Sequence, residues 1–238
     1  MKDSVEVNLR AKLESLAKSM GATYFGIADL ALARQRISEQ GGEFLTRFSR
    51  AVSHGFVLAD GIVNTLAHHK NIAALHTYWY HVYQTVNPHL DSISLMLAQS
   101  LDRAGFQAFI VPSSQTVDRT RLIGVFSHKL AAHLAGLGWI GKSALLITPE
   151  DGPRVRWGTV LTDAPLEAGT PLDEMCHDCD TCVKGCPAHA FTGQAFDNPR
   201  PRSEIFAAEA CDRYLRERET LHRACGICVY ICPFGKNK

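Results

Sequence analysis

Apolar side chains recur at every third or fourth position through the first twenty residues. This spacing puts them on one face of a helix, and the glycine at position 21 is a common helix stop. The positions that form this face are Val5, Leu9, Leu13, Leu16 and Met20. The segment 4–20 is therefore predicted to be an amphipathic helix.

Strands and helices are predicted to alternate along the next 140 residues. Short apolar runs next to turn residues predict strands at 24–28, 55–58, 106–111, 144–147 and 157–161. Helical patterns between them predict helices at 64–84, 87–105 and 128–134. Asn87-Pro88 reads as a helix cap followed by proline at the first helical position. The alternation predicts an α/β or α+β first domain, and with the rest of the chain we expect an α+β protein.

Cysteines divide the chain into two parts. All 8 cysteines lie at or after Cys176, and the preceding 175 residues contain none. The segment 164–173 is the best linker candidate. We therefore expect a first domain over 1–165 and a cysteine-rich domain over 166–238.

The first cysteine run has the spacing of bacterial ferredoxins. It reads C-x2-C-x2-C-x3-C-P and ends in a Cys-Pro pair. In two-cluster ferredoxins the fourth cysteine of such a run binds the other cluster. The members of this run are Cys176, Cys179, Cys182 and Cys186.

The second run repeats this motif without its first cysteine, whose place is taken by His222. It contains Cys225, Cys228 and Cys232, and Cys211 is the remaining cysteine of the chain. Eight thiolates then serve two [4Fe–4S] clusters by cross-ligation, with His222 as an alternative ligand to Cys211. The predicted ligand sets are Cys176, Cys179, Cys182 and Cys232 for one cluster, and Cys186, Cys211, Cys225 and Cys228 for the other.

Two zinc sites are the alternative interpretation. Zinc favours well-separated C-x2-C pairs, and it fits poorly a third cysteine at the same spacing and two Cys-Pro endings. Disulfides need an oxidising compartment, and the start of the chain resembles no export signal. The sequence therefore favours iron–sulfur clusters over both alternatives.

Charge and hydropathy narrow the possible partners. The chain has 25 Lys and Arg against 24 Asp and Glu, a formal net charge of +1. This balance argues against a nucleic-acid partner, because binding to phosphate backbones rests on clustered cations. No run approaches the ~18 apolar residues that a membrane span needs. We expect a cytoplasmic protein that does not enter membranes.

A glycine-rich block at 136–142 matches the pattern G-x-G-x-x-G. A dinucleotide-binding fingerprint needs a strand before it and a helix after it, whereas here the predicted helix comes first and the strand second. The block more simply predicts a helix end at which the backbone approaches another group closely.

The chain resembles epoxyqueuosine reductases in the glycine block combined with the two cysteine runs, and in Leu161-Thr-Asp-Ala-Pro-Leu166 and Met20–Asp29. The resemblance implies a nitroreductase-like, cobalamin-binding domain followed by a ferredoxin-like domain, with electrons passing through the clusters to cobalamin. Low-potential ferredoxin or flavodoxin is the implied donor. The block residues implied to contact cobalamin are Gly136, Gly138, Trp139, Ile140, Gly141 and Lys142.

The sequence departs from the family at the proton donor. Alignment on the glycine block places Leu122 where the family has an aspartate, and Asp118 is the nearest acid upstream. Proton-coupled reduction needs a group that delivers a proton. The candidates are Asp118, His128, Lys129, Tyr80 and Tyr83.

The predicted function is that of an iron–sulfur oxidoreductase whose bound cobalamin reduces an unidentified small-molecule substrate, with tRNA disfavoured. The alternative is an electron-transfer or corrinoid-carrying protein that reduces the corrinoid of a partner and has no substrate chemistry of its own.

Overall fold

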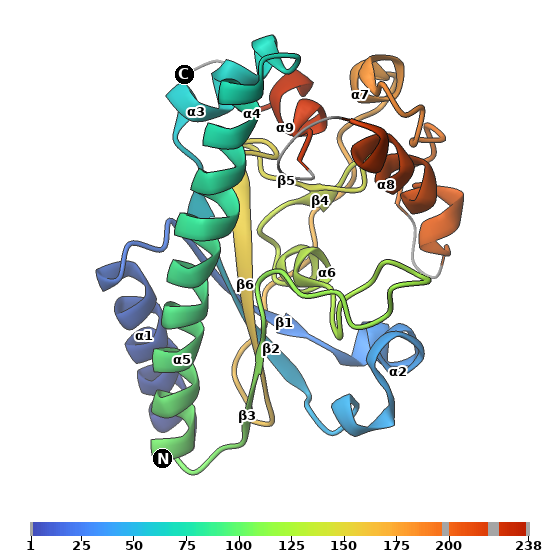
Figure 1. The fold of residues 1–238 in the computed structure, drawn as a ribbon. Helices are drawn as coiled ribbons and strands as arrows, with labels where there is room; N and C mark the ends of the chain where they lie inside the picture. Colours follow the sequence, from blue (N-terminus) through green and yellow to red (C-terminus); the bar gives the residue numbers. More distant parts are fainter. Residues whose placement is uncertain (1, 197–199, 219–223, 237–238) are drawn as a thin grey trace. The chain divides into compact units, whose positions relative to one another are not determined.

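The computed structural model describes residues 2–196, 200–218 and 224–236 (Figure 1). The chain divides into two compact units, each built from three segments. The sheet unit comprises Met1–Phe56, Asn87–Leu137 and Trp157–Leu172. The cysteine unit comprises Val57–Val86, Gly138–Arg156 and Asp173–Lys238. The division therefore does not follow the predicted boundary at 165/166, because 57–86 and 138–156 group with the cysteines.

A four-stranded sheet organises the sheet unit. Its order is β1 (Tyr24–Asp29), β2 (Arg50–Val57), β6 (Val155–Thr162) and β3 (Ala108–Val111). β1 pairs with β2 and β3 with β6, both antiparallel. The mixed helix and sheet content agrees with the predicted α+β class.

Two long helices, α1 (Lys2–Ser19) and α5 (Asn87–Arg103), pack together and cover one face of this sheet (Figure 1). Their buried side chains join those of the strands in one core, since apolar side chains on one helix stripe must be removed from water. The core includes Leu9, Leu13, Ile27, Val52, Ile93, Leu97, Leu101 and Val160. The predicted helices at 4–20 and 87–105 are thus present.

The other face of β1 receives α6 (His128–Leu134) and the turn after it. Side chains alternate across a strand, so Ile27 enters the core while Gly26 points the other way. A Cβ at Gly26 would lie 3.1 Å from both Ala135 and Leu137. The glycine therefore lets this helix end lie directly on the strand.

The predicted helix 64–84 is divided into several shorter elements. These are α3 (Asp60–Asn64), the 3₁₀ helix η3 (Thr65–His68), α4 (Ile72–Trp79) and the π-helix η4 (Tyr80–Val86), which leads into α5. Asn71 starts α4 by accepting the backbone N–H groups of Ala73 and Ala74. An asparagine at a helix start competes with continued helix, a local effect that apolar spacing does not reveal.

Several short elements were not predicted or are shorter than predicted. α2 (Arg34–Gly41), with Ile37 buried, lacks an apolar period, and the 3₁₀ turns η1 (Ala31–Ala33) and η2 (Glu43–Leu45) flank it. The predicted strand 144–147 shortens to β5 (Leu146–Ile147), which pairs with the unpredicted β4 (Trp139–Ile140). The remaining elements are α7 (Thr181–Gly185), η5 (Arg202–Glu204), α8 (Ala208–Glu217) and α9 (Ile227–Ile231).

The predicted linker 164–173 has no regular secondary structure, but it is packed for part of its length. Ala164 and Leu166 are buried in the core of the sheet unit. The backbone N–H of Gly169 donates to the carbonyl of Ile27. None of the described helices is long and apolar enough to cross a membrane.

His54 lies on β2 in the interior of the sheet unit. Its Nε2 is 3.2 Å from the carbonyl oxygen of Leu90 and 3.3 Å from the hydroxyl of Ser94. A Cβ at Gly158 would lie 2.2 Å from the imidazole, so this glycine provides the space for the ring. Burial lowers the pKa of His54 to about 4, and the nearby His128 adds to the decrease.

This buried imidazole predicts a loss of stability in mild acid. Protonation is unfavourable in the folded state, with a pKa of about 4, but ordinary in the unfolded chain near 6.5. The contribution of His54 to the free energy of unfolding is therefore fully present above pH 6.5 and decreases as the pH falls toward 4. We expect the free energy of unfolding to fall by about 2 kcal/mol between pH 7.5 and 5.0 from this group. Urea unfolding at several pH values measures it.

The matched variants for this test are His54→Gln and His68→Gln, since His68 is exposed. The first variant should lose this part of the pH dependence, and the second should retain it. Equal pH dependence in His54→Gln and the parent chain would contradict the assignment.

Candidate metal centre

The eight thiols gather into two groups of four. Burial raises the pKa of Cys232 to about 12, and the nearby Cys176, Cys182 and Cys179 raise it further. Burial likewise raises the pKa of Cys182 to about 11, with Cys176 and Cys179 adding to the rise. These four cysteines, the first thiol set, come from both cysteine runs.

The second thiol set is formed by Cys186, Cys211, Cys225 and Cys228. Burial raises the pKa of Cys211 to about 11, and Cys225 and Cys186 contribute next. The pKa of Cys228 is also raised, first by burial and then by Cys225, Cys211 and Cys186. The structure thus brings together the same two groups of four that the spacing predicts. His222, the alternative ligand, lies outside the described residues.

Close packing of α7 on α9 brings Cys232 to the first run. α7 carries Cys182 and ends at Gly185, and Cys232 directly follows α9. A Cβ at Gly185 would lie 2.3 Å from the Ile231 side chain. The missing side chain therefore permits the approach that places cysteines 50 positions apart in one set.

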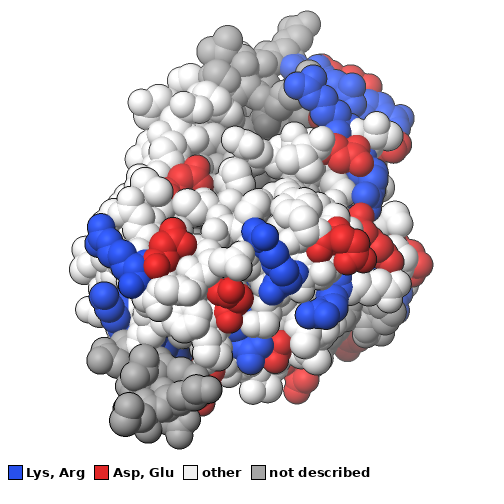
Figure 2. Space-filling view, turned by 90° about the horizontal axis from the view of Figure 1, so that it is seen from below, with Lys and Arg blue, Asp and Glu red and all other residues white. Residues whose placement is uncertain are grey.

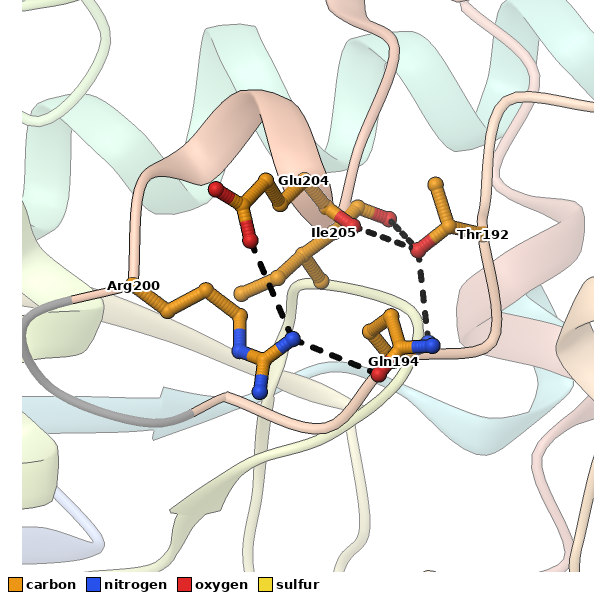
Figure 3. Close-up of polar contacts among 5 residues, drawn as sticks. All are labelled: Thr192, Gln194, Arg200, Glu204 and Ile205. Carbon is orange, nitrogen blue, oxygen red and sulfur yellow. Dashed lines mark hydrogen bonds and ion pairs between the residues drawn. The ribbon is translucent and has the colours of Figure 1, made fainter.

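A polar network joins two parts of the segment that lies between Cys186 and Cys211 in the sequence (Figure 3). The hydroxyl of Thr192 donates to the carbonyl of Glu204 at 2.7 Å, and the backbone N–H of Thr192 donates to Ile205 at 3.2 Å. Arg200 Nη1 lies 3.3 Å from the Gln194 side-chain oxygen and 3.8 Å from the Glu204 carboxylate.

Two stacked phenylalanine rings join the same two parts of the chain at positions nearer to the cysteines. Phe191 and Phe206 stack with ring centroids 5.4 Å apart, and Ala207 N–H donates to the carbonyl of Ala190. The chain that leaves Cys186 is thereby joined to the start of the helix that carries Cys211.

The segment 57–86 covers the second cysteine run. Gly226 has φ +71°, and a Cβ there would lie 2.7 Å from both Leu66 and Tyr78. Burial raises the pKa of Tyr78, and Cys228 and Cys225 are among the smaller contributors, so the phenol lies close to this thiol set. The cysteine-rich segment is therefore not a self-contained ferredoxin, because its buried face depends on a segment more than 100 residues earlier.

Both thiol sets suit clusters by their chemistry. All eight cysteines are free and partly buried, and [4Fe–4S] clusters take four thiolates each. Among the described residues, no three His, Cys, Asp or Glu side chains converge closely enough to hold a single metal ion. Neighbouring cysteines raise the pKa values of one another because their thiolates repel. Cluster binding would relieve this repulsion, since the iron carries positive charge.

The glycine block contacts protein at each of its glycines. A Cβ at Gly136 would lie 2.4 Å from the carbonyl oxygen of Thr170, and one at Gly138 would lie 2.2 Å from that of Ile147. A Cβ at Gly141 would meet Ile147 at 2.9 Å and Cys176 Sγ at 3.0 Å. The predicted close approach is therefore present, but its partners are backbone and a cysteine.

The other members of the block also face protein. Trp139 and Ile140 are buried in β4, and the ammonium of Lys142 donates to the carbonyl of His177. At Gly136, Gly138 and Gly141, protein atoms lie where an added Cβ would stand. Contact of the block with cobalamin stays a prediction.

The candidate proton donors are divided between the two units. Asp118 Oδ1 accepts the backbone N–H groups of Thr120 and Arg121, both at 2.9 Å, and so caps its own loop. Tyr80 begins η4 in the cysteine unit, whereas Asp118 and His128 belong to the sheet unit. Lys129 follows His128 in α6 and is half-buried.

His128 lines a cavity of about 140 Å³ in the sheet unit. This volume is close to the roughly 150 Å³ of an engineered cavity that binds benzene. His128 Nδ1 lies 2.8 Å from the Thr159 hydroxyl and its Nε2 3.0 Å from the carbonyl of Pro112. Because a carbonyl only accepts, Nε2 carries the proton. The other lining residues are Val111, Pro112, Ser113, Ser114, Gln115, Val117, Gly124, Val125 and Phe126.

Leu122 lies in the loop that contains Asp118 and has a left-handed backbone, with φ 52°. This conformation is unfavourable for leucine, and asparagine or aspartate adopts it more readily. The position where alignment on the block places the family's aspartate thus has a backbone suited to that residue.

The surface charges are mixed. On the face drawn in Figure 2, the described Lys and Arg side chains are interspersed with Asp and Glu. This distribution agrees with the balanced composition, and it does not by itself identify a partner.

The thiol sets and the fold define an iron–sulfur protein. Residues 175–235 match the family model described as a 4Fe-4S double cluster binding domain. The prediction of two [4Fe–4S] clusters is thereby confirmed.

Curated relatives support the stated resemblance. An epoxyqueuosine reductase of Listeria monocytogenes is 35% identical over 125 residues, which are 48% of this chain and 31% of that protein. One of Synechococcus sp. is 32% identical over 161 residues, 66% of this chain and 46% of that protein. The chain thus spans less than half the length of these relatives. Its resemblance to epoxyqueuosine reductases is confirmed.

Solved structures share the fold. A selenomethionine-labelled epoxyqueuosine reductase superimposes with a TM-score of 0.63 at 17% identity, covering 98% of this chain and 67% of that one. A catabolic reductive dehalogenase gives 0.68 at 19% identity, covering 94% of this chain and 31% of that one. One further neighbour is an epoxyqueuosine reductase with an epoxyqueuosine-modified tRNA stem loop. Its TM-score is 0.60 at 18% identity, covering 98% of this chain and 66% of that one.

Double variants test the division of the thiols. Cys176→Ser/Cys232→Ser removes two ligands of one set and should leave about four of about eight irons. Cys176→Ser/Cys186→Ser removes one ligand from each set, although both lie in the first run, and should damage both clusters. Iron and sulfide analysis with EPR of the reduced protein measures this. If the second variant keeps one cluster intact, the cross-ligation is wrong.

Gly138→Ala tests whether the block is needed for packing within the protein. We expect a loss of about 1–3 kcal/mol in the free energy of unfolding, because the new methyl group would overlap the Ile147 carbonyl. Gly61→Ala is the matched control, since nothing lies within 4 Å of its added Cβ. Urea unfolding without corrinoid measures both. Equal stability of the two variants would contradict this role.

Proposed function

We propose that the chain is an iron–sulfur reductase that passes single electrons through two [4Fe–4S] clusters to a bound cobalamin, which reduces the substrate. The observation that carries the proposal is the grouping of eight thiols into two sets within a double-cluster domain. Two neighbouring clusters transfer electrons and do not themselves recognise a substrate.

Cobalamin is proposed on similarity. The relatives are named epoxyqueuosine reductases, and one neighbouring structure, with a TM-score of 0.65 and 19% identity, is that of a reductive dehalogenase with B12-dependent dehalogenation. When bound, cobalamin would supply a strongly reducing cobalt centre. The contacts that the glycine block makes lie within the protein.

The expectation that tRNA is disfavoured is not supported. It rested on net charge, whereas the named relatives are epoxyqueuosine reductases and one neighbour was solved with a modified tRNA stem loop. We therefore propose epoxyqueuosine in tRNA as the first substrate to test. Reduction of an epoxide to an alkene consumes two electrons and two protons and releases water. The electrons arrive one at a time through the clusters from a low-potential donor such as ferredoxin or flavodoxin.

A second candidate function is electron delivery to the corrinoid of a partner protein. The loop around Asp118 favours it. Leu122 occupies the position aligned with the family's proton donor, and the Asp118 carboxylate caps its own loop. A protein that only delivers electrons needs no proton donor at this place.

A cobalamin titration distinguishes the two functions. After anaerobic reconstitution, we expect about one corrinoid to co-elute with each protein chain in gel filtration, because the proposed function needs one bound cobalamin per chain to accept the electrons. A low-potential donor should then reduce the cobalt. The control is Cys176→Ser/Cys232→Ser, which should bind corrinoid but reduce it far more slowly because one cluster is missing. Retention of no corrinoid by protein with both clusters would favour the second function.

Substrate turnover is measured separately. Cobalamin-loaded protein should convert epoxyqueuosine-containing tRNA to the alkene, detected by nucleoside mass spectrometry. Cobalt reduction without turnover would leave the reductase proposal in place with a different substrate.

A further inference from the structure

One short segment lies over a single cysteine of the first thiol set. The indole Nε1–H of Trp139 donates to Cys176 Sγ at 3.5 Å. Burial raises the pKa of Cys176, and the backbone N–H of Lys142 is among the groups that oppose this rise. Between these two residues, Gly141 approaches so closely that an added Cβ would lie 3.0 Å from the sulfur. Residues 139–142 therefore supply one indole N–H donor to a cluster ligand and bring their backbone close to the same sulfur.

The tryptophan is held in place from several sides. Trp139 is 1% exposed and pairs with Ile147 across β4 and β5. Its ring contacts Phe234 edge to face, with centroids 4.9 Å apart and planes at 79°. Phe234 itself follows Cys232, another ligand of the same set, by two positions. The indole is thus fixed between two segments that carry ligands.

The Lys142 side chain adds a positive charge beside the same run. Its ammonium donates to the carbonyl of His177, the residue after Cys176. His177 has φ 42°, a left-handed backbone. The hydrogen bond therefore also holds the turn that leads from Cys176 to Cys179.

We propose that Trp139 and Lys142 are positioning residues that raise the reduction potential of the cluster bound by Cys176, Cys179, Cys182 and Cys232. Reduction adds negative charge to the cluster and its sulfurs. Donors and cations beside a sulfur stabilise that charge, and hydrogen bonds to the sulfurs are among the factors that set the potential. The inference rests on the clusters of the proposed function and not on its cobalamin or substrate.

The second thiol set receives different donors. Ala190 N–H donates to Cys186 Sγ at 3.4 Å, and the backbone N–H of Ile227 opposes the rise that burial causes in the pKa of Cys225. Both are backbone groups outside residues 139–142. A change at Trp139 should therefore act on one cluster and leave the other as a reference within the same molecule.

The test is a potentiometric titration of the full chain with both clusters, followed by EPR. Trp139→Phe removes the indole donor and retains an aromatic ring. We expect one midpoint potential to become more negative, the other to stay unchanged, and the iron content to be retained. Cys176→Ser/Cys232→Ser identifies the signals, because it keeps the second cluster alone.

Trp79→Phe is the matched control. Trp79 lies in the same unit and stacks between His76 and Tyr83, with centroids at 6.0 and 6.4 Å. This variant should change neither potential. Unchanged potentials in Trp139→Phe with full iron content would overturn the role of the indole.

Lys142 supplies the second arm, which does not depend on packing of the indole. Lys142→Met should lower the potential of the same cluster, and Lys142→Arg should restore most of it because the charge returns. Equal potentials in the Met and Arg variants would overturn the role of the charge. Failure of the chain to bind corrinoid or substrate would leave these potentials measurable, so the two proposals fail separately.

Discussion

Two [4Fe–4S] clusters require eight thiols in two groups of four, and the packing of the cysteine unit brings these partly buried thiols together. The two runs exchange their ends, so that Cys232 joins the first run and Cys186 joins the second. The exchange depends on places where no side chain intervenes. Gly185 admits Ile231, Gly226 admits Leu66 and Tyr78, and Gly141 admits Cys176. Burial that raises the pKa of a thiol is unfavourable for a free thiolate, and iron offsets it.

The sheet unit has a core of its own. α1 and α5 remove one face of the sheet from water, while α6 lies on the opposite face of β1. This arrangement fixes His128, whose two ring nitrogens are bonded to Thr159 and Pro112. The imidazole therefore forms part of a cavity wall, and both of its ring nitrogens have protein partners. The loop that contains Asp118 and Leu122 borders the same region along the chain, at Val117 and Gly124.

The glycine block shows how one motif admits two interpretations. From the sequence, its glycines indicate a close backbone approach, and the resemblance implies that the approaching group is a corrin. In the structure the approaching groups are the backbone of Thr170 and Ile147 and the sulfur of Cys176. Glycine spacing indicates that another group approaches the backbone closely, but which group it is depends on segments that are distant in the chain. The role of Trp139 could not be found from spacing, because its partner lies 37 positions away.

Local pattern alone determined the elements whose apolar face is regular, such as α1 and α5, and the ligand types and spacing that predict two clusters. These depend on periodicity and on the chemistry of thiolates, which are properties of neighbouring residues. Only the tertiary structure decided the break of the helix at 64–84, the grouping of 57–86 and 138–156 with the cysteines, and the protein partners of the glycine block. Each of these results depends on which distant segment fills the space beside a residue, and that is settled when the chain packs.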